Sequence, residues 1–311
     1  MASFSVTESF GAGFRLIARN PGAILAWAVA YLVIGLLPQL AVMGGMAPSM
    51  LDLFGMAASQ PQGPDIGEMI RLQSNMVVLQ AVNYLCTIAS QAVLTGAVLR
   101  AVLEPDNRRG FYLRFGRQEL WLALVSLVFI VLLAMALFAV MVPIIVTTTI
   151  AGIAAENHGR AGIAGLLVLA FPLVLGAMGW VCLRLSMALP MTFTRRGFQL
   201  FESWHVTKGL TLKLLALFLL LAISLLIIQI VVLGLAGAAV LGLGIAVNEE
   251  AIEAFFTNPP SDWLHRLTPW IAAAAAGASL LSAAMFAIVL APFAEVYREL
   301  TLVPEPAPEV A

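Results

Sequence analysis

The sequence predicts an all-α polytopic membrane protein with six transmembrane helices, and three observations lead to this fold class. Hydrophobic residues make up 61% of the 311 residues and charged residues only 11%, whereas an average soluble domain has about 45–50% and about 25%. Six uncharged apolar runs are long enough to cross a bilayer. The basic residues are also distributed very unevenly between the segments that connect these runs.

The expected spans are recognised by the absence of Asp, Glu, Lys and Arg from each run. A helix needs about 20 apolar residues to cross roughly 30 Å of hydrocarbon. Helices are expected because backbone groups in lipid must be satisfied within the segment. In chain order the runs cover residues 22–45, 76–99, 120–150, 162–183, 214–246 and 269–293.

The orientation of the chain follows from its Lys and Arg residues, because short cytoplasmic segments are enriched in them. Of the 16 basic residues, 13 fall on the side that holds both termini. The other side has three, and its loops, which include 46–75 and 248–267, carry a net negative charge. We therefore expect both termini to be cytoplasmic.

Two short phrases recur along the chain and predict an internal repeat. Glu8-Ser9-Phe10 is echoed by Glu202-Ser203-Trp204, and Arg109-Gly110-Phe111 by Arg196-Gly197-Phe198. Each phrase leads into a long apolar run, and internal repeats are common in polytopic folds. The sequence predicts one transmembrane domain, residues 1–300, and a flexible C-terminal tail, residues 301–311. The domain would contain three repeats of an interfacial helix plus a helical hairpin, at residues 1–104, 105–195 and 196–300.

The N-terminal segment has the pattern of an interfacial amphipathic helix. Apolar residues recur at three- and four-residue steps, and charged residues fall on the opposite face. The apolar face contains Val6, Phe10, Gly13, Phe14 and Ile17, and the charged face contains Glu8, Arg15 and Arg19. We expect such a helix to lie in the headgroup region before the chain enters the membrane.

Polar side chains share one face of the second expected span: Gln80, Asn83, Thr87, Ser90 and Gln91. Amide and hydroxyl groups in a membrane helix can line a polar cavity or substrate path. They also bond neighbouring helices to one another. Both interpretations stay open for this face.

Arginines lie at matched places behind the second and fourth spans, at the edge that is expected to be cytoplasmic. One interpretation is that they snorkel to lipid phosphates as positive-inside anchors. The other is that they form contacts for an anionic lipid headgroup. The residues are Arg100, Arg108, Arg109, Arg184, Arg195 and Arg196.

Nothing in the sequence indicates catalysis, a cofactor or a metal. Cys86 and Cys182 lie in apolar runs without CxxC spacing, and the three histidines fall in separate loops. Nucleophile and phosphate-binding motifs are absent, and so are the basic patches typical of nucleic-acid binding. We therefore expect no enzyme activity, no cofactor and no nucleic-acid partner.

Three segments resemble a loose bacterial group, the six-span membrane domain associated with glycerophosphoryl diester phosphodiesterases and its stand-alone relatives. They are "AVLRAVLEP" at 97–105, "SWHVTKG" at 203–209 and "APFAEVYREL" at 291–300. The resemblance implies an inner-membrane protein connected with lipids. It carries over no catalytic residue, because the His-Arg-Gly signature of the catalytic domain is absent from this sequence.

The function expected from these patterns is that of a non-enzymatic inner-membrane protein that binds membrane lipid or supports a lipid-related protein partner. One alternative is a transporter or channel subunit that uses the polar face of the second span. Another is a structural or assembly factor of the membrane. A cavity that reaches Asn83 and Gln91 would favour the first alternative, and a groove open to lipid near Arg100 or Arg184 would favour lipid binding.

Overall fold

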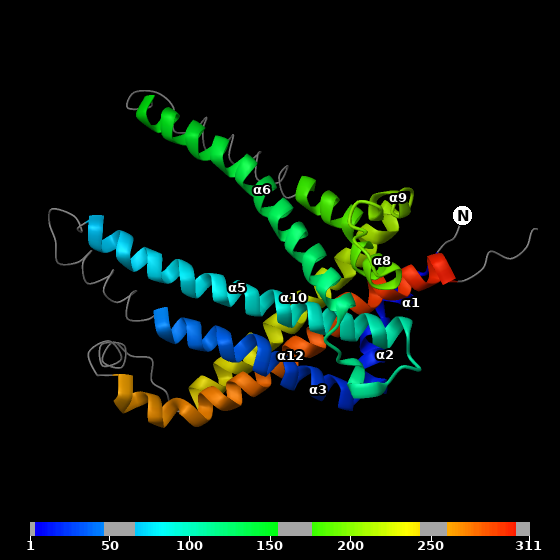
Figure 1. Cartoon of the computed structure of the whole chain (residues 1–311), viewed down its shortest axis with the longest axis horizontal. Helices are drawn as coiled ribbons and strands as arrows, with labels where there is room; N and C mark the ends of the chain where they lie inside the picture. The colour runs from blue at the N-terminus through cyan, green and yellow to red at the C-terminus, as the bar shows by residue number, and fades with distance from the viewer. Residues whose placement is uncertain (1–3, 47–65, 155–175, 243–259, 303–311) are drawn as a thin grey trace, which may run out of the picture. The chain divides into compact units, whose positions relative to one another are not determined.

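The structure is a computed structural model that describes residues 4–46, 66–154, 176–242 and 260–302 (Figure 1). Every regular element in these ranges is a helix, which confirms the all-α class for the described part. The elements are α1 (Val6–Phe10), α2 (Ala12–Arg19), α3 (Pro21–Tyr31), the π-helix η1 (Leu32–Leu36), α5 (Ile66–Leu103), the 3₁₀-helix η2 (Arg109–Tyr112), α6 (Arg117–Ala154), α8 (Ala188–Arg195), α9 (Ser203–Val206), α10 (Thr211–Gly242) and α12 (Pro260–Leu302). Residues 37–46 and 176–185 are helical as well.

Five helical segments of the described part are long and apolar enough to cross a membrane, as expected of an integral membrane protein. They are Pro21–Met46, Met76–Leu103, Arg109–Ala139, Thr211–Ala238 and Ala272–Thr301. The fourth predicted span, 162–183, falls mostly outside the described residues. Six spans therefore stay a prediction.

Two helices extend well beyond the apolar runs that predicted them. α5 has 38 residues and α12 has 43, or about 57 Å and about 64 Å at 1.5 Å per residue. Residues 66–75 and 260–267, which we expected to be outer loop, belong to these helices. Hydropathy marks only the part of a helix that lies in hydrocarbon, so it cannot locate helical turns that continue into water.

Local signals explain where the long helices begin. α3 starts at Pro21, and proline suits a first helical position because the missing N–H would have no helical partner there. Before α6, the backbone N–H of Gly116 donates to Glu119 Oε2 at 2.9 Å, which is half of a capping box. Before α10, Gly209 has φ +87° and lets the chain turn sharply. A short helical element precedes each of these starts, as the predicted repeat requires, but the repeat itself stays a prediction.

The chain divides into two compact units, each formed from separate stretches of the sequence. The first unit comprises Met1–Ser9, Phe115–Phe218 and Phe293–Ala311. The second comprises Phe10–Arg114 and Leu219–Pro292. Each unit is described by itself below.

In the second unit, the helical segment Pro21–Met46 lies beside α5 (Figure 1). The two approach closely at glycines. A Cβ atom on Gly35, in the π-helix η1, would lie 3.0 Å from Ser90 Oγ, and one on Gly45 would lie 3.6 Å from a methyl carbon of Leu79. Small residues at such crossings allow close helix packing in membranes.

The N-terminal amphipathic helix is present as α1 and α2, but its packed face differs from the apolar face predicted for it. Gly13 lies against the backbone of Ile288 in α12, and Leu16 is buried. Phe14 is 41% exposed and contacts the ring of Phe10 at 5.7 Å between centroids. The packed side of α2 therefore includes Gly13 and Leu16, whereas Phe14 is exposed.

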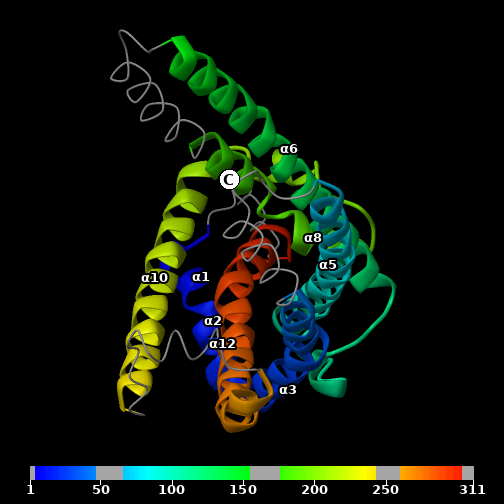
Figure 2. The same ribbon diagram turned by 90° about the vertical axis from the view of Figure 1, so that its left-hand side faces the viewer.

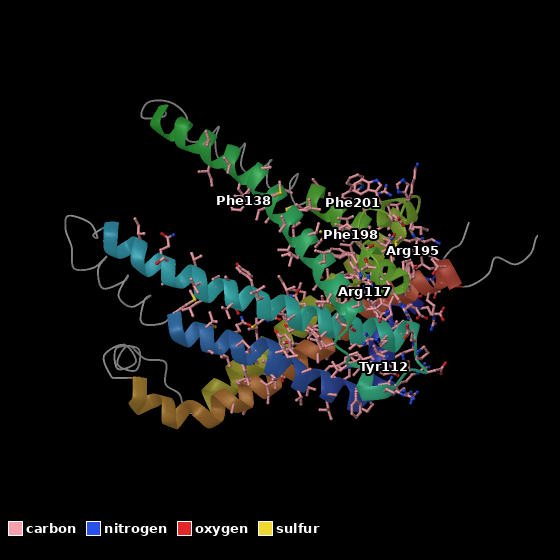
Figure 3. All side chains as sticks on the ribbon, viewed as in Figure 1. Tyr112, Arg117, Phe138, Arg195, Phe198 and Phe201 are labelled. Carbon is pink, nitrogen blue, oxygen red and sulfur yellow. The ribbon has the colours of Figure 1, made fainter. Side chains whose placement is uncertain are left out.

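In the first unit, α6 runs beside α8 (Figure 2). A small core holds them together, formed by the buried side chains of Val125, Leu185, Ala188 and Leu200. Farther along α6 the side chains leave this core, and Phe138 is 66% exposed (Figure 3). Such exposure is ordinary when lipid is the solvent.

Candidate functional site

Arg184 lies against two tryptophans in the first unit. Trp180 precedes it by one helical turn in the 176–185 helix, and Trp204 comes from α9. The guanidinium carbon is 5.4 Å from the Trp180 ring centroid and 5.6 Å from that of Trp204. The two rings meet edge to face at 4.8 Å. The two distances from the guanidinium carbon to the rings are within the range of cation–π attraction.

The guanidinium of Arg184 is incompletely satisfied. Its Nε and Nη1 atoms are buried and have no hydrogen-bond partner. Among the residues that the structure describes, no carboxylate forms an ion pair with Arg184. A positive charge therefore lies at a partly buried position against two aromatic rings, and two of its N–H groups have no hydrogen-bond acceptor.

The backbone beside Arg184 is fixed by two hydroxyl groups from the α9 region. Ser203 Oγ donates to the Arg184 carbonyl at 2.8 Å and accepts from the backbone N–H of Met187 at 3.1 Å. Thr207 Oγ1 donates to the same carbonyl at 3.3 Å. These contacts satisfy a carbonyl and an N–H at the end of the 176–185 helix, where helical partners run out. In the second copy of the Glu-Ser-aromatic phrase, Ser203 thus connects the end of the 176–185 helix to α9.

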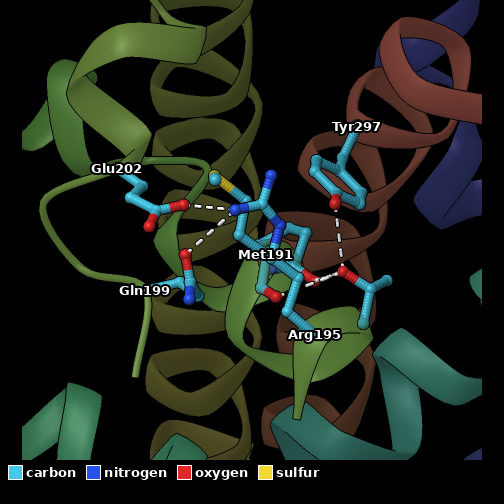
Figure 4. Close-up of polar contacts among 7 residues, drawn as sticks. Met191, Arg195, Gln199, Glu202 and Tyr297 are labelled. Carbon is cyan, nitrogen blue, oxygen red and sulfur yellow. Dashed lines mark hydrogen bonds and ion pairs between the residues drawn. The ribbon is translucent and has the colours of Figure 1, made fainter. Parts of the chain in front are cut away.

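Arg195, at the end of α8, has polar partners in the segment that leads to α9 (Figure 4). Its Nη1 atom donates to Gln199 Oε1 at 3.2 Å and forms an ion pair with Glu202. Next to it, the Thr194 hydroxyl and the Tyr297 hydroxyl share a 3.0 Å hydrogen bond between α8 and α12. The ion pair is exposed, and exposed pairs contribute little, about 0–1 kcal/mol.

Arg100, in the second unit, points inward rather than toward lipid. It is 1% exposed, and its Nη1 atom donates to the backbone carbonyl of Tyr112 at 2.6 Å. Arg108 and Arg109 are exposed near this contact, and Arg196 is exposed in the first unit. The sequence placed Arg100 and Arg184 at equivalent positions, but the structure gives them different surroundings.

The polar face of α5 is used largely within the helix and against its neighbour. The hydroxyls of Thr87 and Ser90 donate to carbonyls one turn earlier, at 2.8 and 2.9 Å. Ser90 is buried near Gly35, and Gln80 and Gln91 are partly buried. The Asn83 Oδ1 atom is buried without a hydrogen-bond partner. The two hydroxyls are therefore satisfied within α5, whereas the Asn83 oxygen is not, and both interpretations of the polar face stay open.

Sequence reasoning missed Trp180 and Trp204 as partners of Arg184. The four-residue step from Trp180 to Arg184 was a usable signal, because such pairs face each other on a helix. Trp204 had no comparable signal, since its contact joins separate elements. Groups of three or more His, Cys, Asp or Glu residues that could hold a metal ion do not occur within the described ranges.

No protein family, curated protein sequence or solved structure matches this chain.

Proposed function

We propose that this protein is a non-enzymatic integral protein of a bacterial inner membrane that binds anionic phospholipid near its cytoplasmic side. The observation that carries the proposal is the Arg184 guanidinium, which lies against Trp180 and Trp204 and has no carboxylate partner among the described residues. Lipid is the ligand in this proposal and is not chemically changed.

A partly buried cation without a counter-charge favours the binding of an anion. Removing a charge from water is costly unless the charge is paired and hydrogen-bonded. Phosphate suits a guanidinium because its oxygens accept charge-assisted hydrogen bonds from the N–H groups. A phospholipid phosphodiester therefore supplies the chemistry that Arg184 lacks.

The neighbours of Arg184 fit the headgroup layer of a membrane. Tryptophan concentrates at membrane interfaces, where its ring is apolar and its N–H is wet. Lys208 and Arg196 are exposed on the following segments, and anionic lipid attracts each such charge by about 1 kcal/mol. The resemblance to a lipid-associated membrane domain supports the same proposal.

The test measures lipid affinity by native mass spectrometry of the detergent-solubilised protein. The probes are dioctanoyl phosphatidylglycerol, dioctanoyl phosphatidylcholine and inorganic phosphate. We expect Arg184→Lys to weaken phosphatidylglycerol binding about tenfold, or about 1.4 kcal/mol, because an ammonium loses the planar fork that contacts phosphate.

The matched control is Arg195→Lys, since Arg195 is exposed and already paired with Glu202. It should change the affinity for phosphatidylglycerol less than twofold. Equal effects of the two substitutions would leave only a general attraction between basic residues and anionic lipid. If inorganic phosphate bound as tightly as phosphatidylglycerol, the ligand would be free phosphate rather than lipid.

A transporter or channel role is the second candidate, favoured by the unpaired Asn83 Oδ1 atom. An unpaired amide oxygen inside a span is expected to find a donor, and water in a polar path is one such donor. In a variant without Cys86 and Cys182, Asn83→Cys should then react with a membrane-impermeant thiol reagent. Failure to react would assign the polar face to helix packing.

A further inference from the structure

The turn between α5 and α6 has an unusual backbone. Gly110, Phe111 and Tyr112 have φ angles of +63°, +54° and +67°. Left-handed conformation is easy for glycine but rare for aromatic residues, and it persists only where surrounding contacts impose it. Two adjacent aromatic residues in this region therefore need an explanation.

Two buried side chains hold this turn by its carbonyl groups. Trp27 Nε1 of α3 donates to the Phe111 carbonyl at 2.8 Å, and Arg100 Nη1 of α5 donates to the Tyr112 carbonyl at 2.6 Å. Trp27 is 0% exposed and Arg100 1%. The Tyr112 hydroxyl also donates to the Pro105 carbonyl at 3.1 Å, so the Tyr112 side chain is folded back inside.

We call the hydrogen bonds from Trp27 and Arg100 to this turn the clamp. With the clamp in place, Phe111 faces outward. The residue is 56% exposed, although hydrogen bonds that served only packing would be expected to bury it. Exposed arginines surround it in sequence, at Arg108, Arg109 and Arg114. The turn at 108–114, which we call the Phe111 prong, therefore exposes one large apolar side chain and three cationic side chains close together in sequence.

The prong lies at the level where the neighbouring spans end. A Cβ on Gly22, the second residue of the first span, would lie 3.6 Å from the Phe111 ring. The two spans, Pro21–Met46 and Met76–Leu103, have 26 and 28 residues. Their lengths of about 39 Å and about 42 Å exceed the roughly 30 Å of hydrocarbon. Their ends, and the prong with them, can reach the headgroup layer.

We propose that the Phe111 prong is a docking surface for the headgroup layer of an anionic leaflet. The Phe111 ring inserts between acyl chains and headgroups, and the three arginines contact lipid phosphates. Charge complementarity selects this occupant, because cationic side chains around an apolar group are typical of segments that bind anionic membranes. The clamp from Trp27 and Arg100 sets the depth of insertion. The prong is separate from Arg184 and does not depend on the lipid site proposed there.

The test places a nitroxide spin label at Phe111→Cys in a protein that lacks Cys86 and Cys182. Collision with oxygen, which concentrates in the bilayer, is compared with collision with a water-soluble nickel chelate. In nanodiscs that contain phosphatidylglycerol we expect oxygen collisions to dominate at position 111. Asp106→Cys is the matched control, because Asp106 is exposed in the same loop, and the nickel chelate should dominate there.

Three outcomes would overturn the proposal. The label at position 111 could be as water-accessible as the label at position 106. It could be equally immersed in nanodiscs of phosphatidylcholine alone, which would remove the role of charge. It could also be shielded from both reagents, which would mean that protein rather than lipid covers the ring.

Two further variants examine the clamp. Gly110→Ala disturbs only the left-handed backbone, because nothing lies within 4 Å of the added carbon. We expect it to make the label at position 111 more mobile and to halve the ratio of oxygen to nickel collisions. Trp27→Phe removes the donor to the Phe111 carbonyl and should act in the same direction. Unchanged immersion in Gly110→Ala, a variant that retains the helices, would show that the clamp does not set the depth.

Discussion

At Gly13 the chain has no room for a side chain larger than hydrogen. A Cβ atom there would lie 2.5 Å from Ile288 Cα and 2.8 Å from the Ala287 carbonyl oxygen, and both are backbone atoms that cannot rotate away. The sequence predicted Gly13 as part of an apolar face but not as a helix contact. Arg100 and Trp27 show the same limit, since each binds a carbonyl of a turn that no residue pattern identified as left-handed.

We predict that Gly13→Ala destabilises the protein, because α2 must move away from α12. Overpacking of this kind costs about 1–3 kcal/mol. The melting temperature in detergent, followed by circular dichroism, should fall by several degrees. Gly234→Ala in α10 is the control, since the added carbon meets nothing within 4 Å and alanine is the better helix former. Its melting temperature should stay the same or rise, and a fall equal to that of Gly13→Ala would refute the tight contact.

At the scale of elements, the sequence predicted the long helices and the N-terminal amphipathic segment, but not the contacts that the short helices make. Uncharged runs identified the five described helices that are long and apolar enough to cross a membrane, because burial in lipid demands apolar residues along the whole segment. α9 has only four residues, and its role depends on a contact with a helix about 20 residues earlier. The candidate site was predictable only in part. The sequence identified its arginines as candidates, but it did not identify their partners, because those contacts depend on tertiary packing.

Ser203→Ala should weaken the connection between α9 and the 176–185 helix. It leaves the Met187 N–H unpaired at a buried position and removes one donor from the Arg184 carbonyl. An unsatisfied buried group costs about 1–3 kcal/mol, which thermal unfolding in detergent should reveal. Ser186→Ala is matched to it, because the Ser186 hydroxyl bonds only a carbonyl of its own helix turn, that of Leu183. If the two variants had the same melting temperature, the Ser203 hydroxyl would not stabilise the contact between α9 and the 176–185 helix.

For the molecule as a whole, charge distribution makes a prediction that the fold alone does not. The helices themselves do not determine which end faces the cytoplasm, whereas the distribution of Lys and Arg between the connecting segments does. Because 13 of the 16 basic residues fall on one side of the predicted spans, the orientation should be strongly defined.

Cysteine labelling of intact cells measures this orientation. In a background without Cys86 and Cys182, Ser59→Cys should react with an impermeant maleimide added outside. Asp106→Cys should react only after the membrane is permeabilised. The reverse pattern would invert the topology and would place Arg184 and the Phe111 prong in the outer leaflet.

The π-helix η1 gives the first span an inserted residue that it can lose. A helix with i→i+5 bonding contains one residue more than the same stretch of α-helix, and such bulges occur as single-turn insertions. Deleting one residue from 32–36 would restore regular i→i+4 bonding and leave residues 37–46 on nearly the same face relative to α3. Gly45 would then still face Leu79 of α5. A one-residue deletion within α3 has no bulge to remove and would rotate the rest of the span by about 100°, so it should be the more harmful of the two deletions.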